Sequence, residues 1–459
     1  MGNKVIGRFA PSPTGLLHIG GARTALFAWL YSKSLGGECF LRLEDTDTER
    51  SKQEYTDSII ASFKWMGIEF DQEPVYQSKN KDNHIERALQ LVESDRAYYC
   101  ECSSERLNKL REDQQKKDQK PKYDGKCRNL NLKRGDTSVI RFKNPESGSV
   151  VFNDLVRGEI EVSNKELDDL IIVRADGSPT YNLCVVIDDL DMNISHVIRG
   201  DDHINNTFRQ INIFKALGEV HPIYGHVPMI LGEDGKRMSK RHGAVNVLDY
   251  KESGVLPEAL VNYVVRLGWS YGDQELFKLE ELKKIFKDGK LNNSPASFSL
   301  EKLLWFNREY FLNLESEELL KKVILESTVF KSDDYSLAVV DLVKERCSLL
   351  SEFENEGSYF FEDNVKINPQ DAERILNEEG LLILDYLNLV FKEIKIWDVK
   401  NIKESINKTM EEKQVGMASV GKPLRLSITG RTNSASVDET CFVLGKERVL
   451  ERLKKILDN

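Results

Sequence analysis

The apolar and polar pattern at the start of the chain predicts a strand, a helix and a second strand. Val5 to Phe9 is a short apolar run that Pro11 ends, and Cys39 to Leu43 is a second such run. Between them, Ala22 to Ser34 is rich in helix-forming residues, and Gly36 is a typical helix stop. Two strands joined by a helix in this way form a right-handed crossover in a parallel sheet. Ligands bind such sheets at the carboxyl ends of the strands.

The chain then alternates between helical and strand-like segments. Between Tyr98 and Asp191 the pattern changes to short strand-like runs separated by turns. Apolar positions three to four residues apart predict helices at about 51–66 and 79–94. Short apolar or alternating runs between turns predict strands at 137–142, 149–152 and 158–162. We interpret this stretch as a mixed α+β insertion. The α/β pattern resumes with a strand at 195–199, a helix to about residue 217 and an apolar run at 228–231.

Beyond about Pro257 almost the whole chain has the pattern of helices. The predicted helices are 256–267, 279–286, 300–307, 316–326, 371–378 and 447–457. The predicted fold is therefore α/β, a parallel-sheet domain with a mixed insertion, followed by an all-α C-terminal region suited to recognition. The expected parts are 1–99 and 191–320 for the two halves of the sheet domain, 100–190 for the insertion and 321–459 for the helical region.

Length, composition and charge narrow the class of protein. The 459 residues suffice for roughly three domains, and no apolar run approaches the ~18 residues of a membrane span. There is no signal-peptide pattern, so we expect a soluble cytoplasmic protein. The net charge of −10 argues against a general nucleic-acid coat protein. Most of the seven cysteines stand singly in apolar surroundings, which is typical of reduced, buried thiols.

The first chemical motif, His18-Ile-Gly-Gly21, lies where the first loop becomes the first helix. Free backbone N–H groups and the helix dipole favour a phosphate there. Gly20 and Gly21 let a base or a phosphate approach the backbone closely, and the imidazole of His18 can donate to a phosphate oxygen as charge develops. For the motif alone, a turn with two glycines and a structural histidine is the better interpretation.

The second motif, Gly235-Lys-Arg-Met-Ser-Lys-Arg-His-Gly243, places four cations within six residues. Such a loop can close on a triphosphate and stabilise departing pyrophosphate, although a solvated basic loop is the commoner meaning of the motif alone. The chain lacks a Gly-x-Gly-x-x-Gly fingerprint and a P-loop, which disfavours nicotinamide and P-loop enzymes. Taken together, the two motifs indicate that one polyphosphate is held from two sides.

These motifs resemble the HIGH and KMSKS signatures of class I aminoacyl-tRNA synthetases. Further segments resemble the bacterial glutamyl-tRNA synthetases, namely Arg8–Gly15, Arg42–Asp47, Pro179–Asn182 and His196–His203. The match is ordered over roughly the first 270 residues, which makes it far more specific than either signature alone. It implies a Rossmann-like catalytic domain, and the helical remainder resembles the anticodon-binding region of that family.

The resemblance implies a glutamate–tRNA ligase, which uses ATP to convert L-glutamate to glutamyl-adenylate and transfers the acyl group to the 3′ end of tRNA(Glu). A carboxylate is already ionised at pH 7, so positioning and charge stabilisation must drive the first step. Mg²⁺ would accompany the ATP, and we expect a monomer. His18 and Lys240 would be the catalytic groups. The residues expected to bind ATP are His18, Gly20, Gly21, Arg237, Met238, Ser239 and Lys240.

Glutamate presents one ammonium and two carboxylates to its pocket. Arg8 and Arg199 are the candidates for the carboxylates, because a guanidinium can bind one with two hydrogen bonds. Glu44 would pair with the ammonium, and Tyr181 would close the pocket and donate a hydrogen bond. The family motif adds two residues to the same pocket, Ala10 and Ser12.

Three cysteines are grouped, and they predict a candidate zinc site. Cys100 and Cys102 form a Cys-x-Cys pair, and Cys127 returns later in the chain with Tyr123 nearby. Thiolates bind Zn²⁺ well, and a structural site needs four ligands. The spacing resembles the zinc-binding insertion of some glutamyl-tRNA synthetases, with Tyr123 or water as the fourth ligand. Three reduced thiols without metal are the alternative.

Three functional alternatives remain open at this stage. The first is a synthetase that charges the glutamine tRNA as well as, or in preference to, the glutamate tRNA, because this choice rests on anticodon contacts in the helical region. A noncatalytic tRNA-binding protein built on the same fold is more remote, because His18, Lys240, Glu44 and both arginines are intact. A general nucleotidyltransferase is weaker still, because it leaves the helical half unexplained.

Overall fold

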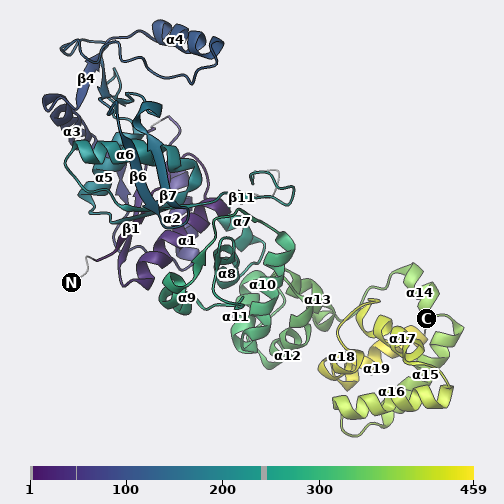
Figure 1. The fold of residues 1–459 in the computed structure, drawn as a ribbon. Helices are drawn as coiled ribbons and strands as arrows, with labels where there is room; N and C mark the ends of the chain where they lie inside the picture. The colour runs from purple at the N-terminus through teal and green to yellow at the C-terminus, as the bar shows by residue number, and fades with distance from the viewer. Residues whose placement is uncertain (1–3, 48, 239–245, 459) are drawn as a thin grey trace. The chain divides into compact units, whose positions relative to one another are not determined.

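The structure is a computed structural model that describes residues 4–47, 49–238 and 246–458. The chain forms two compact units (Figure 1). The first comprises Met1–Tyr250 with Leu260–Leu300, and the second comprises Lys251–Ala259 with Glu301–Asn459. None of the helices within the described ranges is both long and apolar enough to cross a membrane. The finer division of the chain into four parts stays a prediction.

A parallel sheet forms the centre of the first unit, as the strand, helix and strand pattern predicts. Strands β1, β2 and β3 pair in parallel, and so do β9, β10 and β6. The two groups meet at β1 and β9, where the backbone N–H of Ser195 donates to the carbonyl oxygen of Ile6 at 2.9 Å. The bounds are β1 Ile6–Phe9, β2 Glu38–Leu43, β3 Val75–Tyr76, β6 Ser149–Asp154, β9 His196–Gly200 and β10 Ile223–Val227.

Helix α1 is the crossover between β1 and β2 and is apolar on most of its surface. Leu26, Phe27 and Trp29 are almost fully buried. The helix begins three residues before the predicted Ala22, because His18 caps its N-terminus. The other helices of this part of the chain are α2 Gln53–Trp65, α3 Lys81–Glu93, α5 Tyr181–Asp191, α6 Ile204–Ala216, α7 Val247–Glu252, α8 Pro257–Arg266 and α9 Leu279–Ile285, and α1 itself is Ile19–Ser34.

The predicted insertion contains two separate groups of strands. One is a small antiparallel sheet of β4, β5 and β8. Helix α4 lies between β4 and β5 in the sequence. The other is the hairpin of β6 and β7, and β6 is hydrogen-bonded in parallel to β10 of the central sheet. The hairpin therefore extends the central sheet. The bounds are β4 Ala97–Cys100, α4 Ser104–Lys116, β5 Val139–Phe142, β7 Gly158–Ser163 and β8 Ile171–Val173.

Three elements differ in extent from the prediction. The strand expected at 228–231 is reduced to the short β11, and the longer strand β10 lies just before it, ended by Pro228. The helix expected at 371–378 ends at Ile375, and a new helix starts at Glu378 with Asn377 as its cap. The helix predicted at 300–307 runs on to Asn313. The remaining short pairs are β11 Ile230–Leu231 with β14 Ala296–Ser297, and β12 Trp269–Ser270 with β13 Lys290–Leu291.

Helices are the regular structure of the second unit, whose described residues contain no strand, as predicted. Its helices share one continuous hydrophobic core, in which Phe311, Phe353, Leu387 and Leu424 are fully buried. The fold class predicted from the sequence is therefore confirmed. The helices are α10 Leu300–Asn313, α11 Ser316–Glu326, α12 Asp334–Val343, α13 Glu352–Phe361, α14 Pro369–Ile375, α15 Glu378–Glu393, α16 Val399–Lys413, α17 Met417–Thr429, α18 Val437–Leu444 and α19 Lys446–Leu457.

Candidate active site

A cavity of about 210 Å³ lies at the carboxyl ends of the central strands, where the parallel sheet predicts a ligand site. Residues that directly follow β1, β2 and β9 line it, such as Ala10, Glu44 and Asp202. The cavity brings together most of the residues predicted for glutamate and for ATP. These are Arg8, Ala10, His18, Gly20, Gly21, Glu44, Tyr181, Arg199 and Arg237.

The remaining predicted residues lie elsewhere. Ser12 is exposed and does not line the cavity. Met238 is half-buried outside the cavity, and its backbone N–H donates to the carbonyl oxygen of Ile230 at 3.1 Å. Ser239 and Lys240 fall outside the described residues.

Arg42 is the centre of a buried charge network beneath one side of the cavity. Its Nη1 donates to Asp189 Oδ1 at 2.6 Å and its Nη2 to Glu44 Oε1 at 3.5 Å, and Arg42 is fully buried. Arg8 Nε donates to the same oxygen of Asp189 at 3.3 Å. Burial opposes the ionisation of Asp189, but the charges of Arg8 and Arg42 outweigh it and lower the pKa of this carboxyl. Arg8 is therefore oriented before a ligand arrives.

Glu44 and Tyr181 place one acceptor and one donor in the cavity. Burial raises the pKa of Glu44, although Arg42 opposes the shift, so a cationic ligand beside it would favour the carboxylate. Burial raises the pKa of Tyr181 to about 12, so its hydroxyl keeps its proton at neutral pH. That hydroxyl lies 3.0 Å from His203 Nδ1, and burial together with Arg199 lowers the pKa of His203 to about 4.

The guanidinium of Arg199 donates hydrogen bonds from Nε and Nη2, and its Nη1 has no partner. Its Nη2 donates to Thr207 Oγ1 at 2.6 Å and to Gln210 Oε1 at 2.8 Å, and its Nε donates to His226 Nε2 at 3.3 Å. Its Nη1 is buried without a hydrogen-bond partner. Burial lowers the pKa of Arg199, yet an arginine remains charged at neutral pH. A buried cationic donor without a partner is suited to an anionic ligand.

The first motif also lines this cavity. The backbone N–H of Gly21 donates to Nδ1 of His18 at 3.3 Å, at the N-terminus of α1. Surrounding protein and the charge of Arg237 lower the pKa of His18, which keeps the ring neutral at pH 7. A Cβ at Gly20 would lie 3.0 Å from the His18 ring, so a side chain would crowd it. Arg237 is 69% exposed and lies 3.9 Å from Asp202.

Comparison with known families shows to which family the chain belongs. Residues 4–305 match the family described as tRNA synthetases class I (E and Q), catalytic domain. The chain belongs to the class I tRNA synthetases. Residues 301–457 of this synthetase match the anticodon binding domain, and the family resemblance inferred from the motifs is confirmed.

Two solved structures are similar to this synthetase over its full length. One is a glutamate tRNA ligase from Elizabethkingia meningosepticum in complex with its amino acid, at 32% identity and a TM-score of 0.90. The other is a glutamate-tRNA synthetase from Elizabethkingia anophelis, at 31% identity and a TM-score of 0.86. In both comparisons the match covers 100% of each chain.

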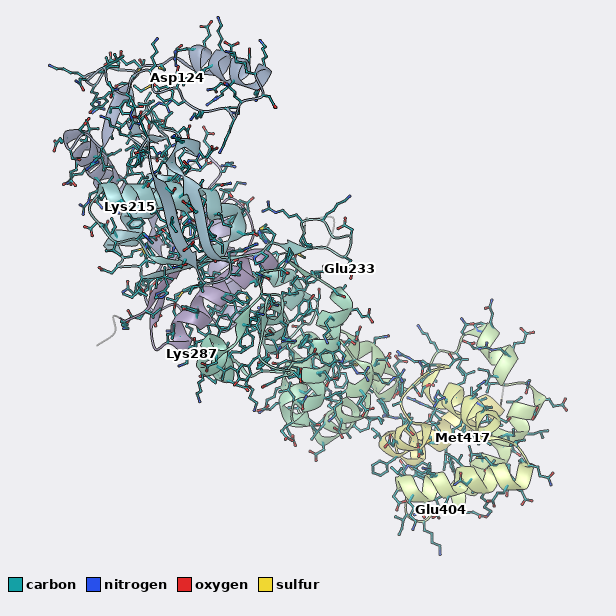
Figure 2. All side chains as sticks on the ribbon, in the orientation of Figure 1. Asp124, Lys215, Glu233, Lys287, Glu404 and Met417 are labelled. Atoms are coloured by element: carbon teal, nitrogen blue, oxygen red, sulfur yellow. The ribbon has the colours of Figure 1, made fainter. Side chains whose placement is uncertain are left out.

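The grouped cysteines of the synthetase lie close together. The sulfur atoms of Cys100, Cys102 and Cys127 all fall within 4.8 Å of one another. The hydroxyl of Tyr123 lies 3.4 Å from Cys100 Sγ and 3.5 Å from Cys102 Sγ. The loop that carries Tyr123 also contains Asp124, which is labelled in Figure 2. The structure thus brings together the four residues proposed as zinc ligands.

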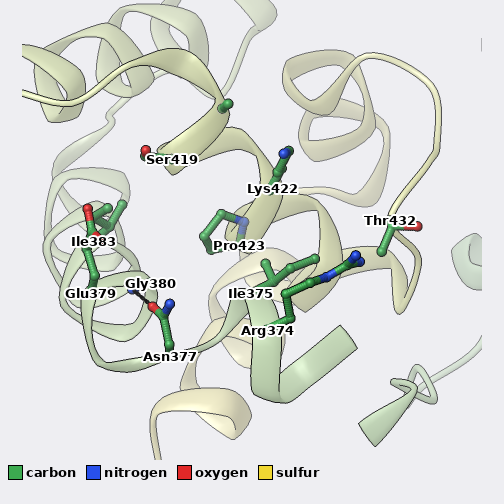
Figure 3. Close-up of a pocket in the computed structure, with 11 residues that line it drawn as sticks. Arg374, Ile375, Asn377, Glu379, Gly380, Ile383, Ser419, Lys422, Pro423 and Thr432 are labelled. Atoms are coloured by element: carbon green, nitrogen blue, oxygen red, sulfur yellow. Dashed lines mark hydrogen bonds between the residues drawn. The ribbon is translucent and has the colours of Figure 1, made fainter. Parts of the chain in front are cut away.

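A second cavity lies within the helical unit of the synthetase, between α14, α15 and α17. Its volume is about 360 Å³, and Figure 3 shows the side chains around it. Arg374 and Lys422 place two cations in its lining and Glu379 one carboxylate, and Arg374 Nη2 lies 2.6 Å from Asp371 Oδ1. Asn377 belongs to the lining too, and its Oδ1 accepts a hydrogen bond from the backbone of Gly380 at 2.9 Å. A concave surface with cations and amide groups is suited to RNA bases and phosphates.

Sequence reasoning missed the residues that support the pocket from behind. Arg42, Asp189 and His203 have no place in the predicted site, yet the first two hold Arg8 and Glu44, and the third contacts Tyr181. One signal was present in the sequence. Arg42 stands inside an apolar strand, and Asp189 follows the apolar run that ends at Ile187. A charge in such a position needs a buried partner, and that requirement predicts an ionic network.

Proposed function

We propose that this synthetase is a glutamate–tRNA ligase. It activates L-glutamate with ATP to form glutamyl-adenylate and pyrophosphate, and it then transfers the glutamyl group to the 3′ end of tRNA(Glu). The observation that carries the proposal is the single cavity that combines Arg8, Arg199 and Glu44 with the helix N-terminus at His18. Two guanidinium groups and one carboxylate match the charges of glutamate, and the helix N-terminus favours a phosphate.

The amino-acid end of the pocket works mainly by orientation. The unpartnered Nη1 of Arg199 is available to a carboxylate, and Asp189 fixes Arg8 for a similar role. Glu44 would accept the ammonium, and the protonated hydroxyl of Tyr181 would donate to an oxygen of the substrate. Because the attacking α-carboxylate is already ionised, the residues around it need to position it and not to deprotonate it.

The nucleotide end works by stabilising charge. His18 and the N-terminal turn of α1 would face the phosphates of ATP, with Gly20 and Gly21 leaving room for the nucleotide. Lys240 would be the main contact of the leaving pyrophosphate, supported by Arg237, Met238 and Ser239. Mg²⁺ would arrive with the phosphates of ATP. The inclusion of Ala10 and Ser12 in the glutamate pocket rests on the family motif.

We also propose a structural Zn²⁺ at the cysteine cluster. The three sulfur atoms fit a tetrahedral site by their spacing, since the distance from Cys102 Sγ to Cys127 Sγ is 3.5 Å. Tyr123 would supply the fourth ligand. Metal analysis of the purified protein tests this, and less than about a tenth of an equivalent of Zn²⁺ would dismiss a structural site. A Cys127→Ser variant should bind less metal, while Cys347→Ser, at an unrelated buried thiol, should bind as the wild type does.

The tRNA partner follows from the second unit. We propose that the cavity lined by Arg374, Glu379 and Lys422 contacts the anticodon region, because it lies in the segment matched as anticodon binding and Lys422 can meet a phosphate there. The synthetase is further proposed to be a cytoplasmic monomer. Light scattering of the purified protein with and without tRNA would reveal a dimer as a doubled mass.

The decisive experiment is aminoacylation of purified tRNA(Glu) and tRNA(Gln) in separate reactions with ATP and glutamate. Charging of tRNA(Glu) alone supports the proposal. Charging of both, or of tRNA(Gln) in preference, would replace it with a nondiscriminating or tRNA(Gln)-preferring synthetase. Absence of ATP consumption with glutamate and either tRNA would indicate a noncatalytic tRNA-binding protein.

A further inference from the structure

Three neighbouring parallel strands place three buried polar side chains in one row behind the pocket. Arg199 lies on β9 opposite His226 on β10, and Asp154 lies on β6 opposite Tyr224 on β10. The side chains of Arg199, His226 and Asp154 are nearly or fully buried. Asp154 belongs to the hairpin that extends the central sheet, so this row depends on the pairing of β6 with β10.

The carboxylate of Asp154 fixes the state of His226. Its oxygens accept hydrogen bonds from the backbone N–H groups of Val156 and Arg157 and from the backbone N–H of His226. His226 Nδ1 lies 2.6 Å from Asp154 Oδ2. Burial opposes ionisation, but these hydrogen bonds outweigh it and lower the pKa of Asp154. An ionised carboxylate only accepts hydrogen bonds, so Nδ1 must carry the proton.

His226 Nε2 is then left as an acceptor. Burial lowers the pKa of His226, which keeps the imidazole neutral at pH 7. Arg199 Nε, which only donates, lies 3.3 Å from this nitrogen, and Thr207 Oγ1 lies 2.8 Å from it. The hydrogen-bond network thus assigns the tautomer of His226 whose Nε2 accepts a hydrogen bond from Arg199. With Nη2 held by Thr207 and Gln210, Nη1 is the one nitrogen of this guanidinium without a partner.

We propose that Asp154 and His226 are positioning residues that orient Arg199 toward the carboxylate of the bound amino acid. The proposal rests on the role given to Arg199 in the proposed function. Asp154 holds the imidazole tautomer, His226 holds the Nε edge of the guanidinium, and the Nη1 edge faces the ligand. Residues that hold a binding group in place determine its orientation. Asp154 and His226 would therefore affect the affinity for the amino acid that Arg199 binds.

Two substitutions at His226 separate the two bonds of its ring. In His226→Asn the amide stands near the place of Nδ1 and can bond Asp154, but the acceptor for Arg199 is lost. In His226→Gln the longer side chain can place its Oε1 near the position of Nε2 and restore that acceptor. Asp154→Asn keeps the shape of the carboxylate but permits the wrong tautomer, whose Nε2–H would oppose the Nε–H of Arg199.

The assay is glutamate-dependent pyrophosphate exchange by the full chain with tRNA present. The expected result is a rise of about tenfold in the KM for glutamate for His226→Asn and Asp154→Asn, and about threefold for His226→Gln. The KM for ATP should change by less than about twofold in all three, and His196→Asn, at a half-buried histidine of β9, should leave both constants near wild type.

The possible results distinguish the positioning role from general structural damage and from the proposed function. Equal effects of Asn and Gln at His226, or a parallel rise in the KM for ATP, would overturn the positioning role and indicate general structural damage. An unchanged KM for glutamate in Asp154→Asn and His226→Asn would overturn it as well. Arg199→Lys is the separate test of the proposed function. If it raises the KM for glutamate while the His226 variants do not, the inference fails and the function stands; if it leaves that KM unchanged, both fail.

Discussion

The two ends of the cavity, proposed to bind the amino acid and the nucleotide, are built in opposite ways. At the amino-acid end, Arg8, Glu44 and Arg199 are at most 6% exposed, and buried partners hold each of the two arginines. At the proposed nucleotide end, His18 is exposed and Arg237 is 69% exposed, with the carboxylate of Asp202 at 3.9 Å. Under the proposed function, preformed contacts would orient the amino acid, whereas the cation that would meet the nucleotide, Arg237, is in contact with solvent.

This difference follows from the cost of burying charge. A buried guanidinium is tolerated only with partners, so the amino-acid end must carry its own counterions, Asp189 and Glu44, whether a ligand is present or not. An exposed cation needs no such partner, because water solvates it. The expected consequence is that substitutions at the amino-acid end affect folding as well as binding, whereas substitutions at the nucleotide end affect catalysis alone.

The largest effect should come from Arg42→Leu, which leaves Asp189 and Glu44 as buried charges without their shared partner. We expect a loss of about 3–5 kcal/mol in the free energy of unfolding, measured by denaturant titration. The matched control is Arg50→Leu, whose ion pair with Asp47 is exposed and should contribute less than about 1 kcal/mol. Similar losses for the two variants would remove the distinction between buried and exposed ion pairs.

Lys240→Ala tests the nucleotide end by activity. Because Lys240 would stabilise charge on the leaving pyrophosphate, adenylate formation should fall about 10²- to 10³-fold while tRNA binding largely survives. Pyrophosphate exchange with tRNA present measures the first, and a filter-binding assay the second. Lys236→Ala, at an exposed cation of the same motif, should change the rate by less than about threefold. Wild-type exchange by Lys240→Ala would contradict its assignment.

Acid should lower the stability of the protein by protonating Asp189, which belongs to the charge network around Arg42. Its folded pKa lies below the unfolded value of 3.8, so the unfolded state binds more protons between these two values. The stability from this group is present above the unfolded pKa and is lost as the pH falls through the folded pKa. Unfolding free energies measured from pH 5 to pH 2 should therefore decrease more steeply for the wild type than for Asp189→Asn, by up to about 1.4 kcal/mol per pH unit. Parallel curves would show that Asp189 makes no such contribution.

Arg237→Ala should have the smallest effect. The side chain is exposed and weakly paired, so its removal should raise the KM for ATP by about three- to tenfold and leave the melting temperature within about 1 °C. Pyrophosphate exchange at varied ATP, together with a thermal melt, measures both. A loss of stability comparable to that of Arg42→Leu would contradict the proposed contrast between the two ends.

The sequence was informative where function depends on residues close together in the chain. His18, Gly20 and Gly21 adjoin one another, and the sheet topology predicts where β1 and β2 end, so the location of the cavity followed. The partners of Arg42 could not be predicted in the same way, because Asp189 is far from it in sequence and approaches it only through folding. Strand β10 was missed because Gly225 and His226 interrupt its apolar pattern, and the burial of His226 becomes visible only beside Asp154.

Helix α4 has a consequence for the engineering of this enzyme. None of its residues is buried, and the segment between Cys102 and Cys127 starts and finishes at sulfur atoms 3.5 Å apart. A peptide tag or a fluorescent label inserted there would have both attachment points at one place, and the rest of the fold would bear no strain from its length. Helix α4 is therefore a favourable position for an insertion, because none of its residues lines the cavity at His18.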